Sequence, residues 1–135
     1  MKVQFHKIYL NEDHLVDSIC KIITLNYKRF IYCLELEECG LTSKPLAKII
    51  EEIRYCNQNL RQVNLSYNCL GRDKDSDLFV DHLCDYIDAQ KMLAHLNISG
   101  MNFSKEHIVQ ISQKVAKAEY LCSVHMSDNA INLYD

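Results

Sequence analysis

The chain repeats a short pattern of apolar and polar positions five times. The clearest copy is LRQVNLSYNCL at 60–70, with apolar residues at its first, fourth, sixth and eleventh positions and Asn68 at its ninth. Further copies lie at 31–41, 93–103 and 121–131, and a weaker copy lies at 5–15; all twenty framework positions are apolar. The alternation inside each copy predicts a short strand with one buried face.

The segments between these copies have the three- and four-residue apolar spacing of helices. The pattern predicts helices at about 14–29, 44–56, 77–91 and 105–119. Ser43, Ser76 and Ser104 stand at the starts of three of them and are candidate N-caps. The charged stretch GRDKDSD at 71–77 lengthens one spacing to 33 residues, from 60 to 93. We expect a solvated loop there, and a protruding contact point is the alternative.

The ninth position of each copy is expected to hydrogen-bond the backbone where the chain turns off its strand. It is occupied by Asp13, Cys39, Asn68, Met101 and Asn129. Asparagine and cysteine can donate such a bond, whereas methionine cannot and an ionised aspartate cannot. Asn102 can take the place of Met101 if the turn shifts by one residue.

This frame resembles the leucine-rich repeat. The segments LELEECGLT at 34–42 and NLSYNCLG at 64–71 are similar to the cysteine-type and asparagine-type repeats of the ribonuclease-inhibitor subfamily. The resemblance covers about 5–131. It implies an α/β solenoid of about five repeats, with parallel strands on a concave face and helices on a convex face, and one domain over 1–135.

The last copy ends at Ile131, so no helix is expected to cover the fifth repeat. Three arrangements remain open for this end. The sequence belongs to a longer chain, or Leu133 and Tyr134 fold back over the open end, or another chain covers it.

The composition of the chain argues against several classes of partner and location. With 24% charged residues and a net charge of −3, the chain gives no electrostatic case for nucleic acid or an anionic membrane. It has no apolar run near the ~20 residues that span a bilayer and no apolar signal-peptide core. Seven cysteines without a C-x-x-C pair predict reduced thiols and a cytoplasmic location, in a host cytosol if the protein is a secreted effector. We expect no cofactor, and a zinc site at Cys33, His95 or His125 lacks a supporting motif.

Strand alternation places the third, fifth and seventh positions of each copy on the exposed concave wall. In its N-terminal half this wall is expected to carry tyrosines and acidic side chains. The side chains of its C-terminal half are expected to be small and polar. The candidate partner-binding residues are Lys7, Tyr9, Tyr32, Glu35, Glu37, Glu38, Arg61, Tyr67, His95 and His125. Exposed tyrosines are plausible anchors for a protein partner. The simpler interpretation is that the glutamates only keep the surface soluble.

The resemblance implies a protein-binding module that docks its partner on the concave face. An inhibitor that covers an enzyme's active site is a specific expectation, and a basic partner surface would complement the glutamates. The alternative is a substrate-targeting segment of a larger protein, such as a secreted bacterial effector, a ligase or an immune-type receptor. We do not expect an enzyme, because His95 and His125 beside serines on an open sheet have no evident pocket, oxyanion donor or orienting acid.

Overall fold

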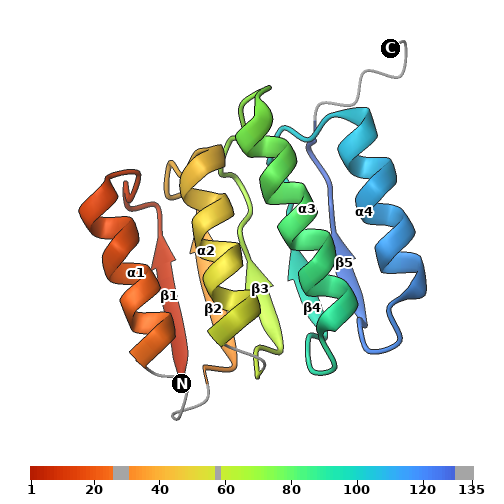
Figure 1. Ribbon diagram of the computed structural model, residues 1–135, viewed down its shortest axis with the longest axis horizontal. Coiled ribbons are helices and arrows are strands. Elements are labelled where there is room, and N and C mark those ends of the chain that lie inside the picture. Colours follow the sequence, from red (N-terminus) through yellow and green to blue (C-terminus); the bar gives the residue numbers. More distant parts are fainter. Residues whose placement is uncertain (26–30, 57–58, 130–135) are drawn as a thin grey trace.

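The computed structural model describes residues 1–25, 31–56 and 59–129. Within these residues, five strands form one parallel sheet in chain order, and four helices lie side by side on one of its faces (Figure 1). The elements are β1 Lys2–His6, α1 Asp13–Leu25, β2 Cys33–Glu37, α2 Ser43–Cys56, β3 Gln62–Asn64, α3 Lys74–Ala89, β4 His95–Asn97, α4 Lys105–Lys117 and β5 Ser123–His125. The predicted α/β leucine-rich repeat solenoid is confirmed.

The strands pair so that equivalent positions of successive repeats stack in columns. Leu34 lies opposite Val63, Val63 opposite Leu96, and Leu96 opposite Val124. The first three of these side chains are fully buried against the helix layer. The core is therefore a continuous row of apolar side chains between the sheet and the helices, as repeat stacking requires.

The predicted register of the first repeat was wrong. Strand β1 places Val3 opposite Leu34 and Phe5 opposite Leu36, so Val3, Phe5 and Leu10 take the fourth, sixth and eleventh positions, five residues earlier than in the copy at 5–15. The error has a simple cause: the first and sixth framework positions are five apart, as are the sixth and eleventh. Phe5 and Leu10 fit either register, and only pairing with β2 decides between them. Asp13, predicted at a turn, is the first residue of α1.

The turns at Cys39, Asn68 and Asn129 are bonded as predicted. Asn68 Oδ1 accepts from the amides of Cys39 and Leu41, at 3.1 and 3.0 Å, and its Nδ2 donates to the carbonyls of Leu36 and Leu65, at 2.7 and 2.8 Å. Each such side chain therefore fastens its own repeat to the preceding one.

Neighbouring turns vary this arrangement. The Cys39 thiol donates to the Phe5 carbonyl at 3.5 Å. At the fourth turn the Met101 main-chain carbonyl accepts from the Leu70 amide at 3.0 Å, and Asn102 donates to the Leu70 carbonyl at 3.0 Å, a different carbonyl from the one that Asn68 and Asn129 bond in their preceding repeats.

One of the three predicted helix caps is confirmed. Ser104 Oγ accepts from the His107 amide at 3.1 Å and caps α4. Asp73, rather than Ser76, caps α3, because its carboxylate accepts from the Ser76 amide at 2.9 Å. The helix therefore starts at Lys74, and most of the predicted loop at 71–77 is its first turn. Ser43 is the first residue of α2, and its hydroxyl accepts from the Gly71 amide at 2.8 Å.

Charged pairs join each helix to the next. Asp17 of α1 pairs with Lys48 of α2, and Asp88 of α3 pairs with Lys114 of α4. Between α2 and α3 the order of charges is reversed, with Arg54 2.8 Å from Asp85. Exposed pairs of this kind stabilise a fold by about 0–1 kcal/mol each. They supplement the apolar packing between neighbouring helices.

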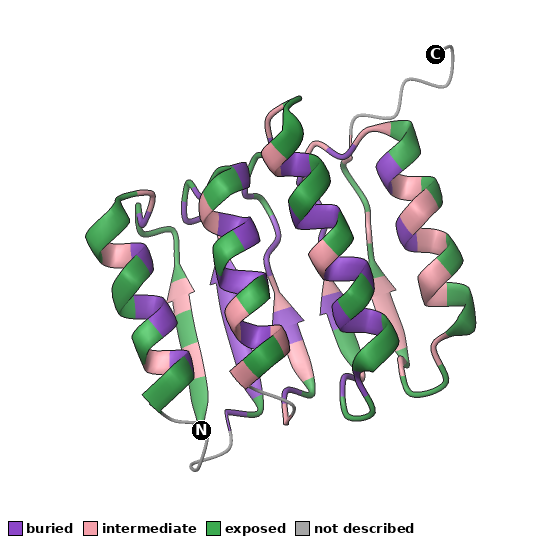
Figure 2. Cartoon of the chain, viewed as in Figure 1, coloured by how far each residue is buried: buried purple, intermediate pink, exposed green. Residues whose placement is uncertain are grey.

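Burial falls off at both ends of the solenoid (Figure 2). Leu93, Leu96 and Ile98 of the fourth repeat are at most 3% exposed, whereas Leu121 and Met126 of the fifth are only half-buried. Val3 and Phe5 of the first repeat are also half-buried. The predicted contribution of residues 133 and 134 lies outside the described residues. Among the described helices, none combines the length and the apolar character that crossing a membrane requires.

Among the described residues, two buried side-chain oxygens lack a hydrogen-bond partner: the hydroxyl of Tyr86 in α3 and Oε1 of Gln90. The Tyr86 side chain is fully buried, and its hydroxyl bonds to no residue that the structure describes. Burial raises the pKa of this phenol far above its usual range. An unpaired buried hydroxyl costs about 1–3 kcal/mol.

We therefore expect Tyr86→Phe to raise the free energy of unfolding by about 1 kcal/mol, because the apolar ring remains and the unpaired hydroxyl is removed. Urea denaturation measures this difference, and Tyr55→Phe, at an exposed tyrosine of α2, is the control. A loss of stability in Tyr86→Phe would show that the hydroxyl has a partner in solution.

Candidate functional site

The face of the sheet that no described helix covers is the candidate site, and we call it the open face. It corresponds to the predicted concave wall. Its residues are Lys2, Gln4, His6, Cys33, Glu35, Glu37, Gln62, Asn64, His95, Asn97, Ser123 and His125. Side chains alternate along a strand, so these residues point away from the core that their neighbours fill.

Glu35 lies at the centre of the N-terminal half of the open face and is already satisfied there. Lys2 of β1 lies 3.4 Å from its carboxylate, and Gln62 of β3 donates to it at 3.2 Å. The Cys33 thiol donates from the same strand at 3.7 Å. Only 8% of Glu35 is exposed. Its carboxylate therefore joins neighbouring side chains of the sheet and is not free to bind a partner.

Glu37 is held in the same way. His6 Nε2 of β1 lies 2.7 Å from its carboxylate, and Asn64 Nδ2 of β3 donates to it at 3.3 Å. The turn residue Glu38 is more exposed and has Lys7 at 3.9 Å. The carboxylates predicted to form an acidic surface in this half are therefore largely hydrogen-bonded by side chains of neighbouring strands.

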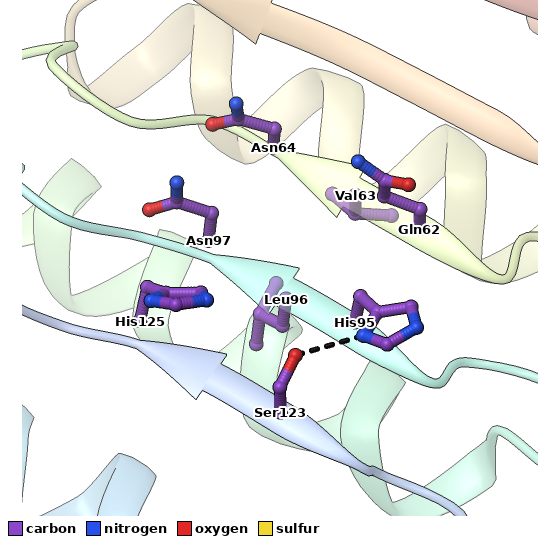
Figure 3. Close-up of a pocket in the computed structure, with 8 residues that line it drawn as sticks. All are labelled: Gln62, Val63, Asn64, His95, Leu96, Asn97, Ser123 and His125. Atoms are coloured by element: carbon purple, nitrogen blue, oxygen red, sulfur yellow. Dashed lines mark hydrogen bonds between the residues drawn. The ribbon is translucent and has the colours of Figure 1, made fainter.

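The C-terminal half of the open face is hollowed. A shallow depression of about 340 Å³ lies over β3, β4 and β5 (Figure 3). Its lining residues are Gln62, Val63, Asn64, His95, Leu96, Asn97, Ser123 and His125. His95 Nδ1 is 2.8 Å from Ser123 Oγ, and His125 is exposed. No carboxylate lines this depression, so its side chains are neutral or basic.

The structure does not gather the predicted tyrosines on the open face. Tyr9 was expected at a strand position, but with the corrected register it follows β1, as does Lys7, and its ring packs against Gly40. Tyr67 lies in the turn after β3, where its ring packs against Gly100 and its hydroxyl donates to Asp128 at 2.7 Å. That hydrogen bond and the Asp128 charge raise the pKa of Tyr67.

Tyr32 lies at the opposite edge of the sheet. It precedes β2, and its carbonyl accepts from the Arg61 amide at 2.8 Å. The predicted anchors thus occupy three places: the edge where strands begin, the open face, and the edge where strands end. His95, His125, Glu35 and Glu37 alone lie on the face itself.

One feature that sequence patterns missed is a column of left-handed turn residues. Each repeat has a positive φ at its eighth position, from 52° to 63°, in Lys7, Glu38, Tyr67, Gly100 and Asp128. Only one of these five is glycine, so composition gives little signal of the turn. The left-handed conformation at Tyr67 directs its side chain along the edge of the sheet where the strands end, and not onto the open face.

The open face also includes Lys2, Gln4 and His6. The register predicted from sequence placed these three residues before the first strand. The alternation of Val3 and Phe5 with polar neighbours was the signal that could have found this strand. Chemically, the face offers amide, imidazole and hydroxyl groups for hydrogen bonding. In the described part of the chain, no carboxylate bonds to His95, and no group of three metal-ligating side chains is present.

The cysteines differ sharply in accessibility, although all seven are free thiols. Burial raises the pKa of Cys20 and of Cys84 to about 11. Cys69 and Cys122 are exposed. Because the thiolate is the reactive form, the buried thiols should resist modification in the folded protein.

We expect a thiol-reactive chromogenic disulfide at pH 8 to modify Cys69 and Cys122 first, with the Cys20 and Cys84 thiols at least about tenfold slower. Peptide mass mapping over time measures the order. All seven should react at comparable rates in guanidinium chloride, and early modification of Cys20 or Cys84 in the native protein would contradict the packing of α1 and α3.

Comparisons with known proteins support the fold. No protein-family model matches the chain, and no curated protein matches its sequence. The solved structure of the tropomodulin C-terminal domain from Caenorhabditis elegans is similar to it, with a TM-score of 0.63 over 93% of this chain and 74% of that chain. The two are 14% identical, so the likeness is one of fold.

This comparison corrects the subfamily assigned from sequence. The similar domain has a leucine-rich-repeat-like fold of the tropomodulin type, and this likeness gives no support to the ribonuclease-inhibitor subfamily. The assignment was wrong because it relied on Cys39 and Asn68. Both residues fasten turns to the preceding repeat, and that task is set by the repeat geometry whatever the subfamily.

Proposed function

We propose that the protein binds another protein through the open face of its sheet. The observation that carries the proposal is that polar side chains of five neighbouring strands form one uncovered surface, held by a rigid row of stacked repeats. Fixed side chains lose little conformational freedom on binding, which favours association. A leucine-rich-repeat-like fold is consistent with this role. We propose that the protein acts by binding without turnover of its own.

Three more specific predictions from the sequence concern enzyme inhibition, a targeting or effector role, and a basic partner surface, and their support differs. Inhibition of an enzyme followed from the ribonuclease-inhibitor resemblance, and it loses its basis with that resemblance. A role as a targeting segment or effector stays a prediction without added support. A basic partner surface also stays a prediction. Glu38 is the acid on which it can still rest, because its carboxylate is exposed with Lys7 3.9 Å away, whereas Glu35 and Glu37 are held within the sheet.

Paired bulky substitutions test the proposed face. Gln4→Trp with His125→Trp enlarges two exposed open-face side chains, and Glu51→Trp with Gln113→Trp enlarges two exposed helix side chains. The tagged wild-type protein is first used to capture partners, which mass spectrometry identifies. Affinity for a purified partner is then measured by calorimetry with each variant.

We expect the open-face variant to bind the partner at least about tenfold more weakly and the helix variant to bind it as the wild type does, because bulky groups prevent close approach only where the partner docks. Circular dichroism and thermal unfolding must first show that both variants fold. The proposal is wrong if the helix variant loses binding and the open-face variant keeps it.

A further inference from the structure

We infer that the depression over β3, β4 and β5 binds an acidic segment of a partner protein, one that carries two carboxylates on alternate residues. The inference rests on the proposed function and specifies the chemistry of its partner. It departs from the sequence-based expectation of a basic partner, because the two halves of the open face differ in charge.

The hydrogen-bonding state of the depression supports this chemistry. Asn97 Oδ1 accepts from the Ser99 amide at 3.1 Å, so the donor group Nδ2 is left to face outward. When His95 Nδ1 accepts from the Ser123 hydroxyl, its Nε2–H is likewise left as a donor. His125 is exposed, and its imidazole bonds to no described residue. Asn97, His95 and His125 therefore each still offer a donor, and Gln62, whose Nε2 donates to Glu35, keeps its Oε1 as an acceptor.

The charge around the depression points the same way. None of its eight lining residues is acidic, and the exposed Arg61 comes one residue before Gln62. The nearest acids of the open face, Glu35 and Glu37, are paired with Lys2 and His6. A carboxylate entering the depression thus meets N–H donors, whereas a lysine or arginine would meet no carboxylate among the eight lining residues.

The dimensions suit a short extended segment. Adjacent strands are ~4.8 Å apart, so crossing from β3 to β5 takes about 10 Å, the length of roughly three extended residues. In such a segment, alternate side chains point to the same side. One carboxylate can then reach the Asn97 and His95 donors and the next can reach His125. A nucleic acid backbone fits less well, because none of the eight lining residues is a lysine or arginine that could pair with successive phosphates.

Three fluorescein-labelled decapeptides test the inference: alternating glutamate and glycine, glutamine and glycine, and lysine and glycine. Binding is followed by fluorescence anisotropy at low ionic strength. We expect the glutamate peptide to bind at least about tenfold more tightly than the other two. His95→Gln with His125→Gln should weaken its binding at least about fivefold, and His125→Gln alone should weaken it less.

The matched control is His14→Gln with His82→Gln, which removes two histidines from α1 and α3 and should leave the affinity unchanged. The inference is overturned if the glutamate peptide does not bind, if the glutamine peptide binds equally well, or if the control weakens binding as much. Tighter binding of a single-stranded oligothymidylate would also overturn it. Binding of the lysine peptide that Gln4→Trp with His125→Trp abolishes would reject the acidic partner and leave the open face as the binding surface.

Discussion

Replacing Asn68 with alanine will lower the free energy of unfolding by about 3 kcal/mol, the largest effect we expect from a single polar substitution in this chain. The Asn68 side chain is fully buried and makes four hydrogen bonds to main-chain groups of two repeats. Alanine would leave two amides and two carbonyls buried without partners. Urea denaturation followed by circular dichroism measures the loss.

Asn129→Ala is the matched control, because Asn129 makes the corresponding bonds at the last turn. Its Oδ1 accepts from the amides of Met101 and Phe103, and its Nδ2 donates to the carbonyls of Ile98 and Met126. The side chain is only half-buried, so water can replace part of what alanine removes. We expect about half the loss seen at Asn68, and equal losses would mean that burial does not set the cost.

Gly100→Ala will destabilise the protein by about 2 kcal/mol, for two reasons that can be separated. Gly100 has φ of +63°, a conformation that strains residues with a Cβ. An added Cβ would also lie 2.4 Å from Cδ1 of Tyr67, so the ring must move. Moving it breaks the 2.7 Å hydrogen bond from Tyr67 to Asp128.

A double-mutant cycle with Tyr67→Ala separates the two causes. Once the ring is absent, Gly100→Ala should cost only the backbone strain, about 1 kcal/mol. Lys7, Glu38, Tyr67 and Asp128 adopt the same conformation in the other repeats, so the strain is tolerable in this fold. Additive effects of the two substitutions would show that the ring does not pack on Gly100 in solution.

The sequence was most informative where the repeat left one possible register. From the second repeat onward, the apolar frame alone predicted the strands and the columns of the open face, because a shift by one residue would expose the apolar side chains. At the first repeat, Phe5 and Leu10 satisfied two registers equally. Pairing between β1 and β2, a contact between distant residues, made the choice.

The candidate site was harder to predict than the fold, because it too depends on contacts between residues that are distant in the sequence. Placing Glu35 and Glu37 on the open face required only alternation, but their pairing depends on Lys2 and His6, which the wrong register had removed from the sheet. The position of Tyr67 depends on a left-handed turn that its own residue type does not favour. The sequence predicted Ser76 as the cap of α3, whereas in the structure Asp73 caps this helix by accepting from the Ser76 amide.

The reversed order of charges between α2 and α3 bears on how the repeats find their proper neighbours during folding. The apolar faces of the helices are similar, so hydrophobic contact alone discriminates poorly between correct and misordered stacking. Docking α2 directly on α4 would bring Arg54 toward Lys114. Docking α1 on α3 would take Asp17 away from Lys48 and place it against a helix that carries five aspartates. Pairs that add little stability can still penalise the wrong order, since like charges brought together raise the energy of the competing arrangement.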